Sequence, residues 1–223
     1  MTLTVTDIQT RARERYNAVG DDFYSDQMLR DLIFDAQQVL AKEGWVIEKT
    51  FSTDSVADQR EYAYPATTLA IKEVRYDYEK LTKRTLSKDP KTSTTDPTGT
   101  PREYALWDDT IILYPTPDTA SDTIQIRVFS YPDDVTSNTD SIQVPEEFKE
   151  DLIVYILMWM ASKDQNLALQ DRYQRLWNET VERVKKQRKK RLRGDRNARV
   201  QDLYFGSDTP PNVEDVYYYN RGY

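Results

Sequence analysis

The sequence predicts an α+β protein with a four-helix bundle-like core, an inserted antiparallel β-sandwich or barrel unit and an extended C-terminal tail. Three observations predict it: apolar side chains recur at helical spacing toward both ends of the 223-residue chain, alternate at strand spacing in the middle, and follow neither period near the C-terminus. We therefore expect a helical core in two parts, residues 1–45 and 144–191, an inserted β domain at 46–143, and a docking tail at 192–223.

The first part of the core contains two predicted helices. Residues 4–18 carry apolar side chains at helical spacing, and Thr4 and Asp7 are placed as a capping box. Ser25 is suited to cap a second helix, whose apolar positions follow a three-four pattern. That helix is expected to end near Gly44, the residue type that most often follows a helix C-terminus.

The middle of the chain is expected to form an antiparallel unit of about five or six strands. Asp108 and Asp109 occupy the apparent turn of a hairpin, and residues 87–101 form a long polar loop. The predicted strands are 45–51, 60–64, 69–78, 103–107, 110–114 and 123–129.

Helical patterning returns at Pro145, where proline followed by Glu146 and Glu147 is typical of a helix start. Residues 152–161 are apolar on every side, which predicts a helix buried centrally in the bundle or between subunits. This run is about half the length of a membrane span, so we expect a soluble protein with no membrane partner. The candidate core or inter-subunit residues are Leu152, Tyr155, Ile156 and Trp159.

A last helix is expected from about 166 to 191, with its final turns almost purely basic. Its predicted inward side chains are Leu169, Tyr173, Leu176, Trp177 and Val184.

The composition excludes much of enzyme chemistry. The chain has no cysteine and no histidine. It therefore has no thiol or imidazole group that could act as a nucleophile, as a base or as a metal ligand. It contains no phosphate-binding or dinucleotide-binding glycine motif, and has only 6 glycines. We expect no catalytic residues, no metal and no cofactor, although an enzyme using only carboxylates stays open.

Charge is unevenly distributed along the chain. Residues 182–199 hold ten basic and two acidic side chains, a net +8, whereas residues 1–181 carry −12. This basic strip is consistent with nucleic-acid binding, with a solvated helix end, or with docking onto an acidic partner or a neighbouring copy. The net negative charge of residues 1–181, the acidic body, argues against a protein whose main function is to bind DNA. The candidate docking residues are Lys185, Lys186, Arg188, Lys189, Lys190, Arg191 and Arg193.

The tail, 192–223, is rich in aromatic residues although it has no periodic pattern. Aromatic clusters in a segment without its own core indicate ordering against another surface, either a partner or the tail's own domain. The candidate docking residues are Leu203, Tyr204, Phe205, Tyr217, Tyr218, Tyr219 and Tyr223.

The order of elements and four short stretches resemble the head-to-tail adaptor (connector) proteins of tailed bacteriophages. The stretches are FYSDQML at 23–29, GTPREYALW at 99–107, TIILYPTP at 110–117 and VPEEF at 144–148. The resemblance spans about residues 4–190. It implies a structural virion protein that forms a ring, most often dodecameric, below the portal protein in the neck of the particle.

The resemblance further implies that tail, nozzle or stopper proteins bind on the far side of the ring. Double-stranded DNA would pass through the lumen during ejection without sequence-specific binding, and assembly would take place in the host cytoplasm. The alternatives are another neck or tail component, such as a stopper or tail tube, or a DNA-binding module that uses the basic segment 183–199.

Overall fold

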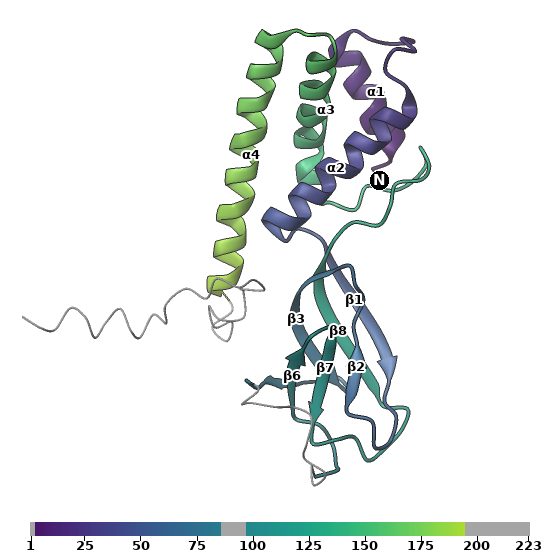
Figure 1. Cartoon of the computed structure of the whole chain (residues 1–223), viewed down its shortest axis with the longest axis vertical. Coiled ribbons are helices and arrows are strands. Elements are labelled where there is room, and N and C mark those ends of the chain that lie inside the picture. The colour runs from purple at the N-terminus through teal and green to yellow at the C-terminus, as the bar shows by residue number, and fades with distance from the viewer. Residues whose placement is uncertain (1–2, 86–96, 195–223) are drawn as a thin grey trace, which may run out of the picture. The chain divides into compact units, whose positions relative to one another are not determined.

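The computed structural model describes residues 3–85 and 97–194, with side chains as far as Lys189. The chain divides after Arg188 into two units, and the first unit holds both four-stranded sheets and all of the four α-helices except the last turns of the fourth. The predicted α+β class is therefore confirmed (Figure 1).

The first two helices begin where their capping residues predict. In α1, Val5–Tyr16, the Thr4 side chain accepts from the Asp7 backbone N–H, and the Asp7 carboxylate accepts from the Thr4 backbone, which is the predicted capping box. In α2, Asp26–Gly44, the Ser25 hydroxyl accepts from the Met28 backbone N–H at 3.3 Å.

α2 ends at Gly44 as predicted, but Gly44 is its last helical residue rather than the residue after it, and Trp45 is the left-handed cap, with φ 52°. Gly44 has a different role: a Cβ there would lie 2.8 Å from Val184 Cβ on α4. The glycine therefore allows α4 to approach α2 closely, while the packed ring of Trp45 holds the less favourable backbone conformation.

The third helix begins with a 3-10 turn. Glu146–Phe148 forms that turn (η1) behind Pro145, and α3, Lys149–Lys163, follows it directly. Figure 1 shows α3 between α1 and α4. Nearly every residue from Leu152 to Ala161 is buried, as its apolar pattern predicts.

The fourth helix, α4, spans Leu167–Gly194. Trp177 and Val184 are buried as predicted, but the prediction for Leu176 is wrong, because this side chain is 40% exposed. Leu176 borders the inward stripe rather than lying in it, a distinction that spacing alone does not resolve.

The β unit consists of two sheets with one shared apolar core. Val74 and Ile126 from the first sheet and Ile111 and Leu113 from the second belong to the same buried cluster. The first sheet has the order β1 Glu48–Asp54, β8 Thr123–Ser130, β3 Thr68–Tyr76 and β4 Glu79–Lys80. The second has the order β2 Glu61–Ala63, β7 Thr110–Tyr114, β6 Glu103–Trp107 and β5 Thr82–Lys83.

Within the described residues, the named strands pair antiparallel except β5 with β6. β6 and β7 have the predicted bounds, and Asp108 takes the left-handed conformation that a tight hairpin needs. The expectation of a wholly antiparallel unit is wrong at β5 and β6, which pair in parallel. Residues 86–96, most of the predicted polar loop between these two strands, lie outside the described residues.

The helices have a core of their own, formed by the inward stripes of all four helices. The segments entering and leaving the β unit contribute Val46 and Val144 to it. Among the described residues, no helix is both long enough and apolar enough to cross a membrane.

Candidate assembly surfaces

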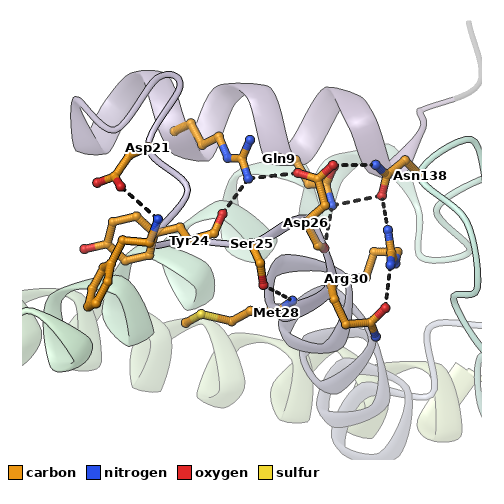
Figure 2. Close-up of polar contacts among 11 residues, drawn as sticks. Gln9, Asp21, Tyr24, Ser25, Asp26, Met28, Arg30 and Asn138 are labelled. Carbon is orange, nitrogen blue, oxygen red and sulfur yellow. Dashed lines mark hydrogen bonds and ion pairs between the residues drawn. The ribbon is translucent and has the colours of Figure 1, made fainter.

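A polar network joins α1 and α2 to the segment that leaves the β unit. Asn138, between β8 and η1, donates its side-chain N–H to Asp26 Oδ2 at 2.9 Å and accepts at Oδ1 from Arg30 Nη1 at 2.7 Å (Figure 2). Gln9 of α1 donates to the same Asn138 Oδ1 at 3.3 Å and to the Asp26 carbonyl oxygen at 3.1 Å. One amide side chain therefore binds α1 and α2, both of which lie more than a hundred positions earlier in the sequence.

Arg13 of α1 completes this network. Its Nη2 donates to Asp26 Oδ1 at 2.8 Å and to the Tyr24 carbonyl oxygen at 2.5 Å. The Arg13 side chain is only 23% exposed, so water screens this ion pair less than it screens a surface pair. The network fixes the connection between α1 and α2, which includes the beginning of the FYSDQML stretch.

The same connection presents apolar side chains to solvent. Phe23 is 51% exposed and Val19 is 73% exposed. Their backbone is nevertheless held: the Phe23 N–H donates to Asp21 Oδ1 at 2.9 Å, and the Lys163 ammonium donates to the Phe23 carbonyl oxygen. The ammonium also lies 4.0 Å from the centre of the Phe23 ring. A rigidly held, exposed aromatic ring is typical of a protein interface.

Two tyrosines and one carboxylate support this end of the helices. The Tyr16 hydroxyl donates to Asp164 Oδ2 at 2.8 Å. The neighbouring Tyr24 hydroxyl and the hydrogen bond from Tyr16 hold the pKa of Asp164 below its ordinary value. Burial, together with the nearby Asp164 charge, raises the pKa of Tyr16 to about 12. Tyr16 therefore keeps its donor proton throughout the neutral range.

Part of the basic strip is engaged with the chain's own acidic and aromatic groups. Arg183 donates to Asp151, which also accepts from Thr180 at 2.6 Å. Lys185 lies 3.9 Å from a carboxylate oxygen of Glu43 on α2. These contacts attach α4 to α3 and α2.

Arg188 ends an aromatic stack that reaches the β unit. Its guanidinium lies 4.0 Å from the centre of the Trp45 ring. Trp45 stacks on Phe129 of β8 with ring centres 5.1 Å apart and an interplanar angle of 26°. Lys72 of β3 lies over Phe129 at 5.8 Å. Trp45 was predicted as the start of a strand, and no local pattern in the sequence predicts this stack.

The remaining predicted docking residues fall into two groups. Lys186 and Lys189 are exposed on α4. The others lie outside the residues whose side chains are described: Lys190, Arg191, Arg193, Leu203, Tyr204, Phe205, Tyr217, Tyr218, Tyr219 and Tyr223.

The four residues predicted on the central helix have unequal exposure. Leu152 and Ile156 are fully buried, and Tyr155 is 9% exposed. Trp159 is 43% exposed. The structure therefore places three of them in the chain's own core and leaves the fourth uncovered.

Within 3–85 and 97–194, no group of three or more acidic side chains is arranged to hold a metal ion. The candidate surfaces consist of ion pairs, aromatic rings and exposed apolar groups, which are suited to protein contacts.

A family model described as SU10 adaptor protein matches residues 3–201 of this chain, which includes all four helices and both sheets. The chain belongs to this family of phage head-to-tail adaptors. Membership indicates a structural, non-enzymatic protein of the virion that binds neighbouring virion proteins. No curated protein matches the chain.

Apart from Arg188, the residues of the polar network around Asn138 and of the Trp45 stack were not among the predicted site residues. The FYSDQML resemblance was the one signal near the network, since it covers Tyr24 and Asp26. Nothing in the sequence pairs those residues with Asn138, which lies more than a hundred positions further along the chain.

Proposed function

We propose that this chain forms a dodecameric ring below the portal protein, joins the capsid vertex to the tail, and provides a conduit for viral double-stranded DNA. The observation that carries the proposal is the adaptor-family match over residues 3–201. In this proposal 1–45 and 144–191 form a bundle-like core, 46–143 is an inserted β-sandwich, and 192–223 is an extended docking tail. Assembly takes place in the host cytoplasm.

The C-terminal region is the proposed attachment to the portal protein. Arg183, Lys185 and Arg188 bind the chain's own groups, which leaves Lys186 and Lys189 of α4 available to a neighbouring copy or to a partner. The tail that follows carries two aromatic clusters, a composition that favours anchoring in a partner's surface. Tail, nozzle or stopper proteins would bind on the other side of the ring.

The charge of the body supports the conduit. Residues 1–181 carry a net −12, so a lumen lined by the body would repel DNA phosphates rather than retain them. DNA could then pass through during ejection without sequence-specific contacts.

The test combines the full chain with the portal protein of the same virus and images the particles. We expect rings attached to the portal protein. A chain truncated after Gly194 keeps the whole of α4 and is expected to keep its thermal unfolding midpoint but to lose attachment. If the truncated chain attaches as well as the full chain, the docking role of the tail is wrong. If the full chain forms no ring on the portal protein, the adaptor proposal is wrong.

The same preparations separate the alternatives. A stopper or tail tube would bind further from the portal protein than an adaptor in the images. A DNA-binding module would bind duplex DNA tightly at low salt and lose affinity steeply as salt rises. The intramolecular contacts of Arg183 and Arg188 argue against that module, because they reduce the charge available to phosphates.

A further inference from the structure

The central helix α3 leaves one large side chain uncovered. Leu152 and Ile156 are fully buried, whereas Trp159 is 43% exposed. The Trp159 ring lies edge-on to Tyr155, with centres 6.3 Å apart, and Tyr155 packs on Trp177 of α4 at 4.8 Å. The exposed ring therefore rests on a rigid, buried support, as anchor residues at interfaces do.

Two exposed carboxylates lie on α2, the helix that packs against α3. Asp35 is close enough to Tyr155 to raise the pKa of its hydroxyl, although burial is the larger cause. Asp31 lies one helical turn before Asp35, and both are exposed. In the ranges that the structure covers, no ion pair joins Asp31 or Asp35 to a lysine or arginine. An exposed indole ring on one helix and carboxylates without an ion-pair partner on the helix packed against it are together suited to bind cationic side chains.

α4 already binds this combination of groups within its own chain. Arg188 lies over the ring of Trp45. Lys185 lies near the carboxylate of Glu43, which is two positions before Trp45 in the sequence. The next cations on α4, Lys186 and Lys189, are exposed and form no ion pair with any described side chain.

We propose that, in the assembled ring, the patch of Trp159, Asp31 and Asp35 on one copy binds Lys186 and Lys189 on α4 of the neighbouring copy. The inference rests on the proposed ring. One chain carries both halves of the contact, which a head-to-tail interface between identical copies requires. The charges are complementary, because the patch lies on the body with a net −12 and the lysines lie in the strip with a net +8.

The absence of cysteine allows a direct test by cross-linking. Full-length Asp35→Cys and Lys186→Cys chains are mixed in equal amounts, assembled on the portal protein and oxidised. Each chain has a single thiol, so every disulfide joins two copies. We expect a disulfide-linked dimer at a yield severalfold above that of a control mixture of Thr10→Cys and Lys186→Cys chains, since Thr10 is exposed on α1.

Charge reversal supplies a second readout. Asp35→Lys alone and Lys186→Glu alone are each expected to lower the ring yield about tenfold, because each creates a like-charge contact. A chain carrying both substitutions should recover most of the yield. The interface is wrong if the wild-type chain forms rings while the Asp35→Cys mixture cross-links no better than the Thr10→Cys mixture, or if the double variant gains nothing. A wild-type chain that forms no ring overturns the proposed function instead, and the interface with it.

Discussion

Arg13 and Arg15, two positions apart on α1, show how the surroundings of an ion pair determine what it contributes. Arg15 lies 2.6 Å from Glu150, but both side chains are about half exposed. Arg13 is 23% exposed and binds both the Asp26 carboxylate and the Tyr24 carbonyl oxygen. Solvent and salt screen the first pair strongly, whereas loss of the second leaves partly buried acceptors without a donor.

Arg13→Ala is therefore expected to lower the free energy of unfolding by about 1–3 kcal/mol. Arg15→Ala is the matched control on the same helix, with an expected loss below about 1 kcal/mol. Urea denaturation of both variants measures the two losses. Equal losses would show that the Arg13 network adds no more stability than an exposed ion pair.

Asp140 gives a prediction of pH dependence. Its carboxylate accepts from the backbone N–H groups of Ser137 and Thr136 at 2.8 Å each, and these bonds hold its pKa below the ordinary value of 3.8. The folded carboxyl thus has a lower pKa than the unfolded one. Its stabilising effect is complete above the unfolded pKa, and is lost as the pH falls through the folded pKa.

Asp140→Asn should accordingly reduce stability at pH 7, and the difference from the wild type should shrink as the pH falls below 3.8. The measurement is the unfolding midpoint of both chains between pH 7 and pH 2. A difference that stays constant over this range would show that the charge of Asp140 contributes nothing.

At the scale of elements, the contact between α2 and α4 depends on the absence of a side chain. A Cβ on Gly44 would meet Val184 Cβ at 2.8 Å and Val46 Cγ1 at 2.9 Å. The Cβ atom of Val184 cannot move without movement of the α4 backbone, and the χ1 rotation that would shift Val46 Cγ1 is restricted because valine is β-branched. Glycine is a poor helix former, so its presence inside the last turn of α2 is explained by this close approach.

Gly44→Ala should lower the free energy of unfolding by about 1–3 kcal/mol, although alanine favours a helix, because the added methyl group forces α4 away. Lys42→Ala, at an exposed position in the same turn, is expected to change stability by less than about 0.5 kcal/mol. Denaturation of both chains tests this, and a Gly44→Ala chain as stable as the wild type would contradict the close contact.

At the scale of the whole molecule, the helical core and the β unit each bury their own apolar cluster. Of the long apolar run of α3, one large side chain, Trp159, remains substantially exposed. The single chain therefore buries an apolar core without contributions from other subunits. Its candidate assembly surfaces consist of separate charged side chains and individual aromatic rings. Such surfaces bind weakly as isolated pairs and become effective when a partner aligns many copies.

We expect the free chain to be a monomer of 26.2 kDa and to form rings only with the portal protein as a template. Sedimentation velocity of the isolated chain measures this directly. A stable ring in the absence of the portal protein would contradict the expectation.

The local patterns predicted most elements well. Thr4, Asp7 and Ser25 mark the helix starts because a cap is formed by residues within one turn of each other. The bounds of β6 and β7 follow from two short apolar and aromatic runs and from the turn between them. The parallel pairing of β5 with β6 could not be predicted, since these strands are separated by a long polar stretch and β5 has only two residues.

The sequence by itself determined the α+β class, the caps and the resemblance to adaptors, because each depends on side chains close together along the chain. Only the tertiary structure decided which assembly residues are available. In the structure, the side chains of Arg183, Lys185 and Arg188 contact groups of the same chain, whereas the Trp159 side chain is exposed. The physical reason is that these pairings join residues 32 to more than 140 positions apart, and the packing of α4 on α2 and α3 alone brings them together.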